Sequence, residues 1–169
     1  MSNPLESLVW VRFSFKLNKN LLKSPVINEV IVVSLFELNG FVSKTIISPC
    51  SNSKLYEGIK TIRVGYLENH KICFIKKWEA NLPPRKLIDN LTDTTFVVEV
   101  NYFLKRDKKK RKLQSDVYHI KVKVHEEGIE FHVRHVAGLM RMSFEEIFTM
   151  FKAIFIKNLK ISTRRARGH

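Results

Sequence analysis

Cysteine, glycine, proline and glutamine are scarce in this chain of 169 residues, which contains two, six, five and one of them respectively. The two cysteines, Cys50 and Cys73, provide neither a disulfide framework nor the four ligands of a structural zinc site. The scattered glycines form neither a Walker-type phosphate loop nor a dinucleotide-binding fingerprint. Apolar runs such as 30–33 are far too short to cross a bilayer. These absences argue against a disulfide scaffold, a nucleotide-binding enzyme of either type and a membrane-spanning protein.

Acidic side chains are also few, because 16 Asp and Glu stand against 30 Lys and Arg, which gives a formal net charge of +14. The excess is uneven, since residues 101–169 hold 17 basic and 7 acidic side chains and therefore +10 of the total. Such asymmetry is the electrostatic footprint expected of a surface that meets a polyanion. The alternative is a lysine-rich surface that only keeps the protein soluble.

Alternation of apolar and polar residues dominates the chain and predicts strands. In segment 8–17 every second residue from Val9 to Leu17 is apolar, whereas Trp10 and Arg12 fall on the other face. Further strands are expected at 41–47, 60–67, 71–78, 94–105, 116–125 and 129–136. A capping box at Ser143 opens a helix whose apolar residues recur at helical spacing and should cover the sheet. The predicted fold class is α+β, a mainly antiparallel β-sheet of six to eight strands with a C-terminal helix packed on one face. We expect one domain over 1–163 and a flexible basic tail at 164–169.

Segment 24–40 carries conflicting signals. Ser24 followed by Pro25 favours the start of a helix, and Asn39 followed by Gly40 favours its end. The β-branched run 30–33 favours a strand instead. Because the apolar spacing also fits one helical face, we expect a helix here, with a strand as the alternative.

The hairpin expected at 116–136 allows its register to be predicted. A two-residue turn at 127–128 places Lys121 opposite Arg134 and makes one face apolar and the other basic. Like charges that face each other on a sheet cost stability. A bound phosphate backbone would relieve this cost, whereas in the alternative the cations splay apart into solvent.

The candidate nucleic-acid contacts are basic residues of the 105–112 segment, the hairpin face and the C-terminal tail. Seven of the eight residues in 105–112 are cations, which should repel one another into a mobile hairpin tip or loop. The predicted contacts are Lys105, Arg106, Lys108, Lys109, Lys110, Arg111, Lys112, Lys121, Lys123, His132, Arg134, Arg164, Arg165 and Arg167. Aromatic rings near these cations would stack on unpaired bases. The stacking candidates are Trp10, Trp78, Tyr102 and Tyr118, for which core packing is the alternative role.

The spacing of histidines and carboxylates indicates no catalytic or metal site. Four of the six histidines lie within 119–135, but nothing in their spacing makes three of them converge, and neighbouring lysines would repel a cation. A nuclease would use Glu99 with Asp89 or Asp93, yet Asn101 stands where a Glu-x-Lys motif requires lysine. We therefore expect no metal, no cofactor and no enzymatic activity, with a metal-dependent nuclease as the enzymatic alternative.

These features predict a non-catalytic nucleic-acid-binding protein with a preference for single-stranded DNA or RNA. The alternative is an assembly subunit that binds a second copy or a protein partner through its Phe-rich C-terminal helix. We expect no membrane partner. Since no basic and apolar leader opens the chain, we expect an intracellular location, cytoplasmic or nucleoid-associated, with a viral protein as an alternative. A curved sheet followed by a helix is similar, in architecture alone, to Whirly-type single-stranded DNA-binding proteins, and no residue role is carried over from them.

Overall fold

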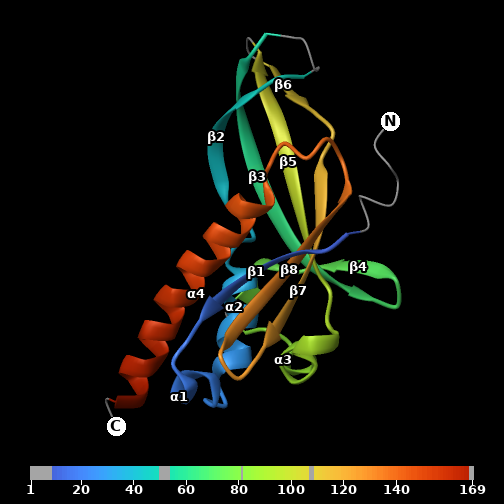
Figure 1. The fold of residues 1–169 in the computed structure, drawn as a ribbon. Coiled ribbons are helices and arrows are strands. Elements are labelled where there is room, and N and C mark those ends of the chain that lie inside the picture. The colour runs from blue at the N-terminus through green and yellow to red at the C-terminus, as the bar shows by residue number, and fades with distance from the viewer. Residues whose placement is uncertain (1–8, 50–53, 81, 107–108, 168–169) are drawn as a thin grey trace.

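The computed structural model describes residues 9–49, 54–80, 82–106 and 109–167. The elements in chain order are β1 (Val11–Lys16), α1 (Lys19–Leu22), α2 (Ile27–Phe36), β2 (Val42–Ile47), β3 (Tyr56–Glu68), β4 (Lys71–Phe74), η2 (Lys77–Ala80), α3 (Arg85–Asp89), η3 (Leu91–Asp93), β5 (Phe96–Arg106), β6 (Lys109–Lys112), β7 (Asp116–Val124), β8 (Gly128–Ala137) and α4 (Phe144–Arg167). The long helix α4 lies against one side of the sheet (Figure 1).

The eight strands form one antiparallel sheet. Its order is β1-β8-β7-β5-β3-β2, with β4 paired to β3 and β6 paired to β5. Four pairs of consecutive strands are neighbours in the sheet: β2 with β3, β3 with β4, β5 with β6, and β7 with β8. The sheet therefore consists largely of hairpins. The predicted α+β fold, with six to eight antiparallel strands and a C-terminal helix on one face, is confirmed.

Helix α4 begins where the sequence predicted, after Ser143. The Ser143 hydroxyl accepts a hydrogen bond from the backbone N–H of Glu146 at 3.2 Å, which satisfies one free donor of the first turn. Phe151 and Phe155 are fully buried, and Phe151 stacks on Phe131 of β8 at a ring-centroid distance of 5.1 Å. These rings pack against the sheet of the same chain, so they are not available as an exposed surface for a partner.

Segment 27–36 is helical, as predicted, in spite of its β-branched run. Ile31, Val32, Leu35 and Phe36 are completely buried. The helix therefore contributes apolar side chains on several faces to the core, and this burial outweighs the modest strand preference of isoleucine and valine. Ser34 satisfies its hydroxyl inside the core by donating to the carbonyl oxygen of Val30.

The β7–β8 hairpin forms, but the predicted register is wrong. Lys121 lies opposite His132, and Arg134 lies opposite His119, so the two cations do not face each other directly. The backbone N–H of His125 donates to the carbonyl of Gly128 at 2.8 Å, which makes 126–127 the two-residue turn. The turn lies one residue earlier than predicted, because Gly128 is the first residue of β8 and not a turn residue. The glycine allows a close approach to β1, since an added Cβ would lie 2.1 Å from the carbonyl oxygen of Phe15.

The assignment of residues to the two faces of this hairpin is nevertheless confirmed. A turn that moves by one residue changes the sum of paired residue numbers by two, and side chains alternate with a period of two. Val122 and Val133 are fully buried, and Lys121 and Arg134 lie on the opposite side. The pattern of apolar residues thus determined the faces without determining the register.

The C-terminal arginines extend α4. Its backbone is helical through Arg167. Residues 164–167 therefore belong to the helix, whereas we expected them to form a tail that follows it. Positions 168–169 and the side chains of Arg165 and Arg167 lie outside the described part of the chain. The flexibility of this segment stays a prediction.

Candidate nucleic-acid interface

Strands β1, β8 and β7 expose a basic face on the side of the sheet away from α4. We call it the basic sheet face. It consists of Trp10, Arg12, Lys16, His119, Lys121, Lys123, His125, Glu130, His132 and Arg134. The register places these residues on one side because the alternate residues, such as Phe131 and Val122, are buried beneath them.

Trp10 brings two cations of this face together. The guanidinium carbon of Arg134 lies 4.7 Å from the centroid of the Trp10 ring, and Nζ of Lys121 lies 5.8 Å from it. An indole ring attracts cations through its quadrupole, and a contact of this kind contributes about 0.5–2 kcal/mol. The ring therefore stabilises the proximity of two like charges that sit diagonally on neighbouring strands.

His119 holds Arg134 from the other strand. Nη2 of Arg134 lies 3.2 Å from Nδ1 of His119, and since a guanidinium can only donate, His119 accepts through an unprotonated Nδ1. Burial and, secondarily, the charge of Arg134 lower the pKa of His119. The Nε of Arg134 is buried and has no hydrogen-bond partner among the described residues. Arg134 is thus fixed in place while its hydrogen-bonding capacity is only partly used.

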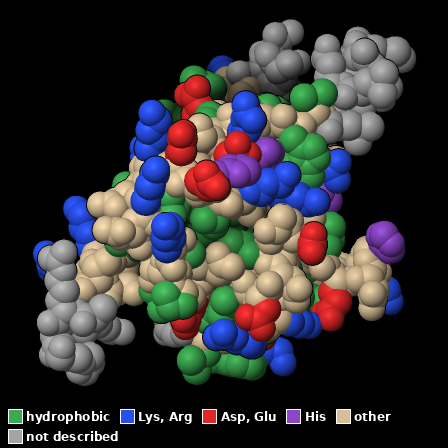
Figure 2. All heavy atoms as spheres, turned by 60° about the horizontal axis from the view of Figure 1, so that its bottom comes forward, with side chains coloured by type: hydrophobic (Ala, Val, Ile, Leu, Met, Phe, Trp, Pro, Cys, Tyr) green, Lys and Arg blue, Asp and Glu red, His purple; other side chains and the backbone are tan. Residues whose placement is uncertain are grey.

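Glu130 is the acidic member of the basic sheet face. Its Oε2 accepts hydrogen bonds from Nε2 of His125 and from Nε2 of His132, each at 2.9 Å, and its Oε1 lies 3.6 Å from Nη1 of Arg12. The hydrogen bonds from His125 and His132 lower the pKa of Glu130 to about 2. The carboxylate therefore stays ionised and offsets part of the positive charge. Seen from the lower end of the fold, acidic, basic and histidine side chains lie next to one another (Figure 2).

Lys121 and Lys123 lie on the basic sheet face without an acidic partner among the described residues. Within the described ranges, neither lysine forms an ion pair, although Lys123 lies opposite Glu130 in the register. The fold brings four predicted contacts onto one face, namely Lys121, Lys123, His132 and Arg134. His132 also contacts Glu130 there.

The basic hairpin β5–β6 lies apart from the basic sheet face. Val97 pairs with His119, and Lys105 follows Val97 by eight positions along β5, which corresponds to about 26 Å. Figure 1 shows this hairpin at the opposite end of the sheet from the β7–β8 turn. Lys105, Arg111 and Lys112 are exposed there, whereas Lys108 and the side chains of Arg106, Lys109 and Lys110 lie outside the described residues.

The C-terminal cations form a third separate group. Arg164 is exposed near the end of α4. The last turns of this helix lie beside α1, because Thr163 and Lys160 line a groove together with Asn20 and Leu21. The predicted contacts whose side chains the structure describes are therefore distributed over three regions of the surface and do not form one continuous patch.

Two of the four predicted stacking residues are in the core, and this corrects their prediction. Tyr102 is 2% exposed and Tyr118 is completely buried, so neither ring can reach a base. Both fall on the inward side of their strands, in line with Val100 and Ile120. Trp78 is 65% exposed, but it lies in η2 and is not part of the basic sheet face. Trp10 is the predicted stacking residue that the structure places among the cations.

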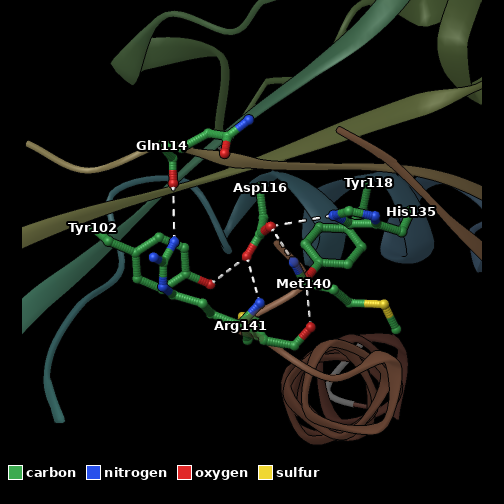
Figure 3. Close-up of polar contacts among 8 residues, drawn as sticks. Tyr102, Gln114, Asp116, Tyr118, His135, Met140 and Arg141 are labelled. Atoms are coloured by element: carbon green, nitrogen blue, oxygen red, sulfur yellow. Dashed lines mark hydrogen bonds and ion pairs between the residues drawn. The ribbon is translucent and has the colours of Figure 1, made fainter. Parts of the chain in front are cut away.

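A buried carboxylate that the sequence did not single out organises the connection from β8 to α4. Asp116 is completely buried, and it accepts hydrogen bonds from the hydroxyl of Tyr102 at 2.8 Å and from the backbone N–H groups of Met140 and Arg141 at 2.6 and 2.8 Å. Nε2 of His135 lies 3.2 Å from the same carboxylate (Figure 3). The sequence did contain a sign of this burial, because Asp116 alternates in phase with the apolar residues Tyr118, Ile120 and Val122 and so falls on the inward face of β7.

The Asp116 contacts hold the backbone of 138–142 in an unusual path. Met140 has a φ of 57°, which is unfavourable for a side chain of this size. The hydroxyl of Tyr118 donates to the carbonyl of Met142, and burial raises the pKa of both Tyr102 and Tyr118. Because the carboxylate is sealed from solvent, we interpret this network as a structural support for α4.

Two of the carboxylates considered for a nuclease, Glu99 and Asp89, contact separate basic or amide groups. Glu99 accepts from Nδ2 of Asn101 at 3.0 Å and lies 3.8 Å from Arg63, while Asp89 pairs with Arg85 at 3.2 Å. In the part of the chain that the structure describes, no three His, Cys, Asp or Glu residues are grouped as a metal site would require.

Comparisons with known proteins add no relatives. No family model matches the chain. Neither the curated proteins nor the solved structures contain a match. Across the described residues, none of the helices combines the length and the apolar character needed to span a membrane.

Proposed function

We propose that this chain is a non-catalytic nucleic-acid-binding protein that contacts phosphates of single-stranded DNA or RNA through the basic sheet face. The observation that supports this proposal is the convergence of Lys121 and Arg134 on the ring of Trp10, with Lys123 on the same face. Cations beside an aromatic ring are the combination that single-stranded nucleic acids require, because phosphates bind the charges and bases stack on the ring.

The other cationic groups would extend the contact. Lys105 on β5 lies about 26 Å along the sheet, and Lys105 and Lys112 fall on the same side of the sheet as His119, so a nucleic-acid strand that crosses this side could meet both groups. The net charge of +14 would attract a polyanion from a distance at low ionic strength. A base-specific contact is not part of this proposal, because sequence-tolerant stacking and phosphate binding account for the arrangement.

The test is a titration of the purified protein with labelled single-stranded DNA, single-stranded RNA and duplex DNA at two salt concentrations. We expect single strands to bind more tightly than duplex, with a log–log salt slope of about −0.7 for each phosphate contacted. Absence of binding to any of the three at low salt would contradict the proposed function.

A second candidate function, assembly with another protein, is favoured by the edge strand β2. Within the described residues β2 pairs only with β3, and its outward side chains Val42 and Ile46 are 62% and 69% exposed. Exposed apolar residues on an unpaired edge favour the addition of a strand from another chain. A mass above that of the monomer in light scattering, returned to the monomer by Ile46→Lys, would support this function.

A further inference from the structure

The acidic member of the basic sheet face is bonded to two side chains whose charge depends on pH. His125 and His132 reach the same oxygen of Glu130 from the turn and from β8 respectively. Histidine is the side chain that gains its proton between about pH 8 and pH 5. With neutral imidazoles this cluster has a formal charge of −1, and with two imidazolium groups it has a formal charge of +1.

We propose that the cluster of His125, Glu130 and His132 regulates the basic sheet face, so that the face binds a nucleic-acid strand more tightly as the pH falls. This inference rests on the proposed function. At high pH the carboxylate of Glu130 repels phosphates that approach the neighbouring lysines, and at low pH two added charges outweigh it.

The surroundings of the cluster make a charge change there effective. The charged groups that face it come from five parts of the chain: Arg12 and Lys16 from β1, Lys19 and Lys23 from α1 and its C-terminal cap, Lys121 and Lys123 from β7, Glu126 and Glu127 from the turn, and Arg134 from β8. Lys123 lies directly opposite Glu130, and Lys121 lies directly opposite His132. A protonated His132 would therefore extend the row of lysines that we propose to hold phosphates.

The other described histidines of this region do not fit the same role. His119 has a lowered pKa because of burial and of Arg134, which favours its neutral form over the same pH range. His135 lies on the core side of the sheet, where its Nε2 contacts the buried Asp116. His70 is exposed in the β3–β4 turn and serves as the control, because it carries the same imidazole group but lies outside the basic sheet face.

The test measures the binding of a fluorescent oligothymidylate by anisotropy at about pH 8 and about pH 5.5, at constant ionic strength. We expect the wild-type protein to bind about tenfold or more tightly at the lower pH and its salt slope to steepen by up to about 1.4, the value for two added phosphate contacts. The double variant His125→Gln/His132→Gln should lose this response, and His70→Asn should keep it. Glu130→Gln should bind more tightly than the wild type at pH 8, because it lacks the repelling charge.

Four outcomes would overturn the inference. Equal affinity of the wild type at both pH values, or an unchanged response in the double variant, would do so while the proposed function remained. Binding by Glu130→Gln at pH 8 that is no tighter than the wild type would also contradict it. Absence of binding by the wild type at both pH values would refute the inference together with the proposed function. Thermal melting by circular dichroism at each pH shows that every variant is folded under the conditions of the titration.

Discussion

Nη2 of Arg134 lies 3.2 Å from Nδ1 of His119 across strands β7 and β8. This contact replaces the direct opposition of Lys121 and Arg134 that the sequence suggested. Arg134 has a neutral imidazole as its cross-strand neighbour and the ring of Trp10 beside it, and no acidic side chain pairs with its guanidinium in the described part of the chain. The cation is therefore positioned before any ligand binds, which lowers the entropic cost of contacting a phosphate.

The pKa of His119 provides the first prediction. Burial lowers this pKa and the charge of Arg134 lowers it further, so an NMR titration of the ring protons should give a value below that of an ordinary histidine. In Arg134→Gln the pKa should rise, but it should remain below the ordinary value because the burial persists. A pKa in the variant equal to or below that of the wild type would contradict the contact.

Trp10 and Trp78 should differ in their effect on binding. Trp10→Ala should weaken the binding of a single-stranded oligonucleotide by about tenfold, because it removes a stacking surface and the ring that holds Arg134 and Lys121. Trp78→Ala is the matched control, since Trp78 is exposed but lies in η2, and its affinity should equal that of the wild type. Anisotropy titrations of both variants would make this comparison. Equal losses of affinity in the two variants would contradict the role of Trp10 in binding.

Asp116 should matter for stability. Asp116→Asn places an amide against two backbone N–H groups and a tyrosine hydroxyl, so buried donors lose their acceptor and the free energy of unfolding should fall by about 2–4 kcal/mol. Asp89→Asn is the control, because Asp89 forms a surface ion pair with Arg85, and it should change stability by less than about 1 kcal/mol. Urea unfolding measures both. Similar values for the two variants would contradict the structural role of Asp116.

The sequence was sufficient for the fold because periodicity acts over whole elements. The helix from Ser143 and the alternation in 116–136 each repeat their signal several times, so both elements were predicted with the correct faces. The register of the β7–β8 hairpin depended on one residue, Gly128, whose close approach to Phe15 of another strand cannot be read locally. The predicted pairing was wrong for this reason.

The candidate site was predicted only in part. Tyr102 and Tyr118 were placed by their nearness to basic residues in the sequence, but they alternate in phase with the buried Val100 and Ile120, so both rings lie in the core. The contact between Glu130 and His132 was not predicted. Residues two apart on a strand share a face, but whether their side chains touch depends on their rotamers, which the sequence does not show. The separation of the β5–β6 hairpin from Lys121 follows from the lengths of β5 and β7 in the sheet, which only the structure shows.

The most direct measurement compares two triple variants that lose the same formal charge. Lys121→Ala/Lys123→Ala/Arg134→Ala removes three cations of the basic sheet face that form no ion pair among the described residues, and Lys71→Ala/Lys157→Ala/Lys160→Ala removes three exposed lysines elsewhere. In titrations with a single-stranded oligonucleotide at low salt, the first variant should lose more than about 100-fold in affinity and reduce the salt slope by about 2. The second should retain affinity within about threefold of the wild type. Equal effects of the two variants would contradict the account, because they would show that net charge alone, and not this face, binds the strand.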